Sequence, residues 1–162
     1  MDSNLNFKKS DLLSEEIHSK LPDLSVASAL EIGEIAKSFG VMRDLPIAIE
    51  VRIGDWIIYH ASLPGSTVEN QWWIDRKARV VMLKHHSTMY ERVLAQERGV
   101  DWHKENNLLD ETHAIHGGGL PLITKSDGFV GVLLISGLPQ VDDHLLGVEV
   151  LTEFLARKGE LL

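Results

Sequence analysis

The sequence predicts an α+β fold in which one antiparallel sheet of about five strands is covered by helices. Strand patterns come in adjacent pairs, at 46–61 and 120–135, instead of alternating one by one with helices. Consecutive strands joined by a short turn pair antiparallel, whereas strands that alternate with helices build parallel sheets. Helical patterns precede, separate and follow the two pairs, so helices are available for both faces of the sheet. The length of 162 residues suits a single domain.

The chain before the first strand is predicted to be helical. Residues 1–10 are polar, and we expect them to be loosely held. Leucine and isoleucine side chains spaced along one face predict a short helix over 11–19. A longer helix is predicted to start at Ser25, because apolar residues between 29 and 39 recur at helical spacing, and Gly40 is placed to end it.

Residues 46–53 carry the clearest strand pattern. Isoleucine and valine occupy every second position, and alanine, glutamate and arginine occupy the positions between them. A Gly54-Asp55 turn then leads into a partner strand at 56–61. We therefore predict a hairpin whose two faces differ in polarity.

Two possible capping boxes indicate where the central helices begin. Ser66 and Glu69 have the spacing at which each side chain bonds the backbone amide of the other at a helix start. Thr88 and Glu91 repeat this spacing, which predicts a break near His86-Ser87 and a second helix after it. One inward stripe is expected along the first helix and beyond it. The stripe comprises Ile74, Ala78, Val81, His85 and Met89.

The chain after the second helix is predicted to be a short helix and a linker. Gly99 is placed to end the second helix, and Asp101 to cap a helical turn that extends to 106. Residues 107–112 then connect this turn to the second strand pair.

The second strand pair surrounds the Asp127-Gly128 turn. Strands are predicted at 120–124 and 129–135, and the latter has apolar side chains on both alternating faces. A strand of this kind is covered on both faces, so we expect 129–135 at the centre of the sheet. A last helix is predicted from about 142 to 158, with aspartates at its start and basic residues at its end, as the helix dipole favours. One sheet with helices on its faces gives a profilin-like or PAS-like shape.

Composition excludes several classes of function. The net charge of −8 argues against nucleic acid as a partner, because phosphate binding needs clustered lysine and arginine. The absence of cysteine excludes disulfides, thiolate metal sites and cysteine nucleophiles. No segment has the character of a signal peptide or a membrane span, so we expect a cytoplasmic protein without a membrane partner.

Histidine is the most suggestive residue type, with eight in the chain. His113 and His116 would share a face only on a helix, and the glycines that follow favour a strand, which would separate them. His85 is expected to face inward, where it would bond the backbone or, alternatively, serve as an axial haem ligand. No group of histidines and carboxylates has a known metal-ligand spacing, so no metal site is assigned.

The glycine run Gly117, Gly118 and Gly119 allows two interpretations. Its amides could cradle an anion, or the missing side chains could let neighbouring backbone pack closely. The run lacks the arrangement of the known phosphate-binding loops, so we favour close packing.

Three pairs of neighbouring residues complete the candidates. Arg76-Lys77 would meet a carboxylate of a ligand or of a neighbouring subunit, or would form an intramolecular or solvated ion pair. Trp72-Trp73 would mark an interface if exposed and a core if buried. Asp143-His144 would complete a catalytic triad with Ser136, but no nucleophile elbow surrounds that serine, and we interpret the pair as a helix cap.

Two segments and one short motif carry a family resemblance. The segments are GGGLPL at 117–122 and GFVGVLLISGLPQVDDH at 128–144, and the motif is W-x-x-R-K at 73–77. Together they resemble the GlcG/HbpS-like family, often labelled the haem-degrading domain family, and in particular its branch of uncharacterised proteins. The likeness covers 46–154. It implies a profilin-like α+β sheet, a ring or paired-ring assembly of subunits, and binding of haem or a related tetrapyrrole.

The combined prediction is an oligomeric, cytoplasmic small-molecule-binding protein with haem as the first ligand to test. The pocket is expected near the 117–119 loop and the start of the final helix. Two alternatives stay open: a haem-degrading enzyme, in which bound iron does the chemistry, and a structural or scaffolding oligomer without a ligand. No catalytic residue is assigned. The candidate ligand-binding residues are Arg76, Lys77, His85, His113, His116, Gly117, Gly118, Gly119, Asp143 and His144.

Overall fold

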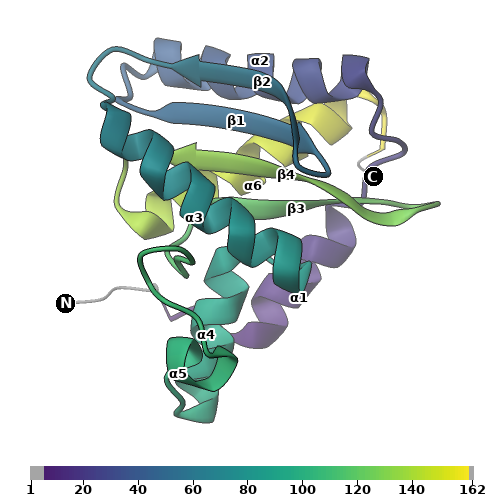
Figure 1. Ribbon diagram of the computed structural model, residues 1–162. Coiled ribbons are helices and arrows are strands. Elements are labelled where there is room, and N and C mark those ends of the chain that lie inside the picture. The colour runs from purple at the N-terminus through teal and green to yellow at the C-terminus, as the bar shows by residue number, and fades with distance from the viewer. Residues whose placement is uncertain (1–5, 161–162) are drawn as a thin grey trace.

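The computed structural model describes residues 6–160 and confirms the α+β class with one antiparallel sheet (Figure 1). This part of the chain contributes four strands in the order β2-β1-β4-β3, where about five were predicted. The strands are β1 (Ala48–Ile53), β2 (Trp56–Ser62), β3 (Gly119–Thr124) and β4 (Gly128–Ser136). The helices are α1 (Lys9–His18), α2 (Val26–Met42), α3 (Val68–Lys84), α4 (Thr88–Arg98), α5 (Trp102–Asn106) and α6 (Gln140–Arg157).

Helices cover both faces of the sheet. Figure 1 shows α3 crossing one face, with α2 and α6 behind the other. Val132 and Leu134 of β4 pack against α3, and Leu133 and Ile135 pack into the core beneath α2 and α6. All four side chains are fully buried. Strand β4 is therefore central and covered on both faces, as its pattern predicted.

The helices α1, α4 and α5 extend the molecule past the β3 side of the sheet (Figure 1). Helices α1 and α4 enclose a small core that includes Leu12, Met89 and Val93, and Trp102 of α5 packs in a separate cluster. Of the segment predicted to be loosely held, residues 1–5 lie outside the described part, and Phe7 packs against this core. Within residues 6–160, every helix is too short or too polar to span a bilayer.

The longer N-terminal helix does not end at Gly40, as predicted, but continues to Met42. A Cβ atom at position 40 would lie 2.4 Å from Cδ1 of Leu63, which is closer than van der Waals contact allows. This glycine therefore lets α2 approach the chain that follows β2, and a helix-end signal was the wrong interpretation of it.

The capping residues of both helices are shifted by one position from the predicted boxes, and only α3 has a complete capping box. At the start of α3 the Thr67 amide donates to Asn70 Oδ1 (2.8 Å), so the box uses Thr67 and Asn70. At the start of α4 the Tyr90 amide donates to Ser87 Oγ (3.0 Å). The break between the two helices and the end of α4 at Gly99 are confirmed.

Two histidine predictions are wrong. His85 does not face inward: it ends α3 in the left-handed conformation (φ 61°), is exposed, and stacks on the ring of Phe129 at 4.1 Å. The segment 113–116 is not a strand, because its backbone does not pair with a neighbouring strand. The Ala114 amide instead donates to the Arg76 carbonyl (3.2 Å).

Candidate functional site

A cavity of about 270 Å³ lies where β4 ends and α6 begins, beside α3. This is the place that the sequence predicted for a pocket, next to the 117–119 loop and the start of the final helix. Its walls come from α3, from the end of β4 and from the first turn of α6. The lining residues are Asn70, Trp73, Lys77, His116, Ser136, Gly137, Leu138, Gln140 and Asp143.

Lys77 and Asp143 form a buried ion pair in the wall of this cavity. Lys77 Nζ donates to Asp143 Oδ2 (3.2 Å) and to the carbonyl of Ile135 (2.9 Å). Asp143 Oδ1 accepts from the Leu138 amide (3.0 Å), so the carboxylate also fixes the turn that leads into α6. Burial lowers the pKa of Lys77, although Asp143 opposes this shift, and burial raises the pKa of Asp143 to about 6. Both shifts favour neutral groups.

The imidazole of His116 stands on the same cavity wall. Its ring lies edge-on to Trp73, with 4.7 Å between the centroids. Burial lowers the pKa of His116 to about 4, and the positive charges of Arg92 and Lys77 add to this effect. At neutral pH the ring is therefore uncharged and keeps a lone pair for a proton or a metal ion.

Three further polar side chains line the cavity, and the sequence analysis missed them as ligand groups. Asn70 Nδ2 donates to Ser136 Oγ (3.3 Å), which connects the first turn of α3 to the end of β4. Gln140 Oε1 accepts from the Gly117 amide (3.1 Å). Nothing in the sequence marks Asn70 or Gln140, because only the packing of α3 and α6 against β4 brings them together.

The glycine run beside the cavity serves close packing. Side-chain oxygens of the protein itself accept from the amides of Gly117 and Gly119, at 3.1 Å from Gln140 and 3.0 Å from Thr88. A Cβ atom at Gly118, which has φ +119°, would lie 2.7 Å from Lys77 Nζ. The run therefore does not offer these two amides to an anion, and Gly118 makes room for the lysine amine.

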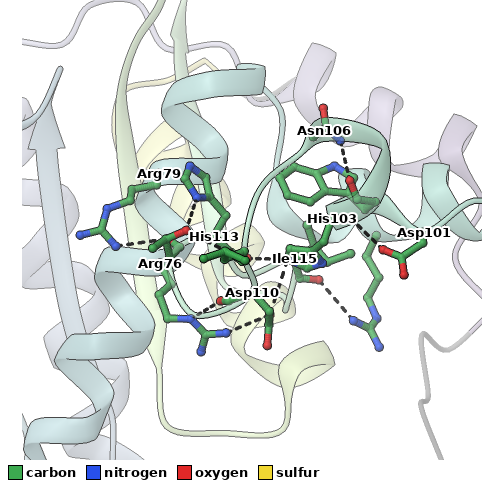
Figure 2. Close-up of polar contacts among 12 residues, drawn as sticks. Arg76, Arg79, Asp101, His103, Asn106, Asp110, His113 and Ile115 are labelled. Atoms are coloured by element: carbon green, nitrogen blue, oxygen red, sulfur yellow. Dashed lines mark hydrogen bonds and ion pairs between the residues drawn. The ribbon is translucent and has the colours of Figure 1, made fainter.

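Arg76 supports the cavity from behind. Its guanidinium lies over the rings of both Trp72 and Trp73, at 4.0 and 4.3 Å from their centroids. It also pairs with Asp110 (2.9 Å), and its Nε donates to the Asp110 carbonyl (2.7 Å; Figure 2). The basic pair Arg76-Lys77 thus forms intramolecular ion pairs, one of the alternatives that the sequence left open. Trp72 is exposed (45%) and Trp73 is half-buried, so Trp72 meets the condition given for an interface and Trp73 lies between the two alternatives.

The other predicted ligand residues lie elsewhere. His113 belongs to the 110–115 segment, where Figure 2 shows it near Arg79, and its carbonyl accepts from His103 Nε2 (2.7 Å). His144 is buried but faces α1, where Nε2 pairs with Glu15 Oε1 (2.9 Å). His85 is on the surface. Of the predicted set, Lys77, His116 and Asp143 line the cavity. Gly117–Gly119 and Arg76 do not line it but contact residues that do.

Comparison with known proteins identifies the family of this chain. The family model described as "Haem degrading protein HbpS-like" matches residues 24–152. A UPF0303 protein of Streptomyces avermitilis is 35% identical over 147 residues, which cover 91% of this chain and 90% of the relative. The crystal structure of Ybr137w protein has a TM-score of 0.81 at 24% identity and covers 92% of this chain and 88% of its own. A structure titled PduOC:Heme Complex has a TM-score of 0.64 at 15% identity and covers 78% and 94%. The chain belongs to the HbpS-like family, as its 117–122 and 128–144 segments predicted.

Proposed function

We propose that this protein binds a small organic molecule bearing a carboxylate, in the cavity between Lys77, His116 and Asp143. The observation that carries this proposal is the buried amine of Lys77 on the wall of a cavity of about 270 Å³. A buried cation with a cavity beside it attracts an anion, because electrostatic attraction is stronger where water is scarce.

The charges around the cavity support an anionic ligand. Three cations, Arg76, Lys77 and Arg92, act on the imidazole of His116, against one anion, Asp110. Asp143 balances Lys77 directly. The charges that act on His116 are therefore more positive than negative, inside a protein whose net charge is −8.

Haem, which the family description suggests, fits this site in part. His116 supplies an uncharged imidazole nitrogen, and a propionate arm is small enough for the cavity. The porphyrin ring is too large for the cavity, because pockets that enclose even drug-sized ligands have volumes of about 300–1,000 Å³. In addition, most of the side chains that line this cavity are polar. One copy of the chain therefore fits a propionate and an axial donor but does not enclose a macrocycle.

Haem or a related tetrapyrrole is accordingly the second candidate ligand, with its ring outside the cavity. The position of His116 favours haem as a ligand, because His116 lines the cavity and His85 and His113 do not. Titration of haemin into the purified protein should give a saturable Soret band that weakens in His116→Ala. His85→Ala and His113→Ala serve as controls that keep the band. A band that is insensitive to His116→Ala would exclude this ligation.

The carboxylate proposal has its own test. Lactate serves as the probe and propan-2-ol, which lacks the carboxylate, as its control. Saturation-transfer NMR should show transfer from the protein to lactate and not to propan-2-ol. The double variant Lys77→Met/Asp143→Asn removes both charges without leaving one of them buried alone, and it should lose the transfer. Absence of transfer to lactate in the native protein would contradict the proposal.

We also propose that the protein is a homo-oligomer, a ring or a pair of rings. Strand β2 is at the edge of the sheet, and Trp56 and Ile57 on it are 62% and 49% exposed. An edge strand with exposed apolar side chains is a template for pairing with another chain. The opposite edge is less open, because the Leu21 amide donates to the Ile123 carbonyl of β3 (2.8 Å).

A further inference from the structure

Lys77 combines three features that distinguish it from an ordinary ion-paired lysine. Its side chain is 2% exposed, its amine forms part of a cavity wall, and its hydrogen-bond partners there are one carbonyl and one carboxylate. Gly118 lets the backbone pack directly against Nζ, since a Cβ atom there would lie 2.7 Å from this nitrogen. A surface lysine has none of these features, because water surrounds its ammonium group.

We propose that Lys77 forms a reversible imine with a small 2-oxo acid bound in this cavity. The inference rests on the proposed carboxylate-binding role and adds a covalent step to it. The carboxylate of such a ligand meets the positive surroundings of His116, and the carbonyl carbon is presented to Lys77 Nζ. A volume of about 270 Å³ accommodates a ligand of a few carbon atoms.

Asp143 supplies the acid–base chemistry that imine formation requires. An amine attacks a carbonyl only in its neutral form, and burial, which lowers the pKa of Lys77, increases the neutral fraction. The proton that leaves Lys77 passes to the carboxylate of Asp143, whose pKa burial raises to about 6. A carboxyl group with a pKa near neutrality both accepts and returns a proton under physiological conditions.

The step balances without an oxidant or a reductant. The nitrogen lone pair of Lys77 forms a bond to the carbonyl carbon, and the carbonyl π electrons move to oxygen. A proton then moves from the positively charged nitrogen to this oxygen and gives a neutral carbinolamine. Asp143 then returns its proton to the hydroxyl group, water leaves, and the nitrogen lone pair forms the C=N bond. The net reaction is ammonium plus ketone to protonated imine plus water, with Asp143 returned to its carboxylate form, and hydrolysis reverses it.

Trapping with cyanoborohydride tests the proposal, since it reduces an imine to a stable secondary amine. The full-length protein is incubated separately with pyruvate, acetone and lactate. Acetone lacks the carboxylate, and lactate lacks the ketone group. Peptide mass spectrometry then locates the adducts. We expect pyruvate to label Lys77 faster than the exposed Lys37 and Lys104, because the cavity holds the ketone beside an amine whose neutral fraction is increased by burial. Acetone should label Lys77 more slowly than pyruvate, and lactate should give no adduct.

The outcomes separate this inference from the binding proposal. Saturation transfer to lactate without a pyruvate adduct at Lys77 would overturn the imine and leave the binding role intact. Equal labelling of Lys77 and Lys37 would also overturn it, because the cavity would then contribute nothing. Lys77→Arg keeps a cation for Asp143 and cannot form an imine, so pyruvate labelling of this variant should fall to the level of the exposed lysines. If that variant does not fold, the peptide map of the native protein still decides.

Discussion

Lys77 and Asp143 show why a buried ion pair has to be judged as a unit. Each is almost fully enclosed, and each is held by the backbone as well as by its partner, through the Ile135 carbonyl and the Leu138 amide. Removing one member leaves the other as an uncompensated buried group, whereas removing both does not. The pair links α3 to the turn before α6, so its loss also loosens the cavity.

The first prediction concerns this pair. We expect Asp143→Asn to lower the free energy of unfolding by about 3 kcal/mol at pH 7, because Lys77 then lacks its counter-ion. The double variant Lys77→Met/Asp143→Asn should recover most of this loss, since asparagine can still accept from the Leu138 amide and methionine is of similar length. Urea unfolding of the three proteins measures both values. A single variant as stable as the native protein would show that the pair is not ionised in the fold.

The second prediction concerns His116 and pH. Its pKa is about 4 in the folded chain, below the ordinary value of 6.5, so the unfolded chain binds the proton more tightly. His116 therefore contributes stability that is present above pH 6.5 and lost as the pH falls toward 4. The loss is at most about 3 kcal/mol, and partial exposure of the ring reduces it.

Comparison with His116→Gln isolates this contribution. Asp143 has a raised pKa and acts with the opposite sign, since its contribution is present below the ordinary value of 3.8 and lost as the pH rises through about 6. This contribution is common to both proteins and cancels in the difference. The unfolding free energy of the native protein should therefore fall relative to that of His116→Gln between pH 6.5 and 4. Parallel curves would contradict the lowered pKa.

At the scale of the elements, local patterns predicted the strands well. The alternation at 46–53 and the doubly apolar run at 129–135 report directly which side chains meet a helix, because every second residue of a strand shares a face. Helix ends were predicted less well. His85 is in register with the inward stripe of α3, but the helix ends there and a left-handed backbone turns the side chain to the surface.

The candidate site was predictable only where the chain itself brings residues together. Lys77 and the 117–119 run were found because they belong to recognisable segments. Asp143 and His144 are neighbours in sequence, yet successive residues of a helix point about 100° apart, so one reaches the cavity and the other faces α1. Asn70 and Gln140 enter the site through tertiary packing alone, which no local pattern reports.

The third prediction concerns a glycine inside α2. Alanine is favoured over glycine in a helix by about 1 kcal/mol, so Gly33→Ala would stabilise an isolated α2. Here a Cβ atom at position 33 would lie 2.2 Å from Cγ of Tyr59, within the ring that β2 places against the helix. We therefore expect Gly33→Ala to lower the unfolding free energy by about 1–3 kcal/mol in urea titrations. In a Tyr59→Ala background the same change should be neutral or stabilising, and a loss of equal size there would exclude the ring contact as the cause.

At the scale of the whole molecule, the two edges of the sheet differ in what they offer to another chain. The segment around Leu21 bonds to β3 on one edge, while β2 at the other carries exposed Trp56 and Ile57. The cavity lies between α3, β4 and α6, and β1 and β4 are the interior strands of the sheet. Association through β2 would therefore leave the elements that build the cavity unchanged.

The last prediction is that association depends on this edge. Native mass spectrometry of the purified protein should give a multiple of the 18.1 kDa chain mass. Ile57→Lys places a charge on the edge strand, as natural edge strands do to prevent pairing, and should shift the mass toward the single chain. Leu109→Lys is a matched control, because Leu109 is 61% exposed in the linker that follows α5 and lies on no strand. A native mass equal to one chain would remove the oligomer, and equal dissociation in both variants would move the interface away from β2.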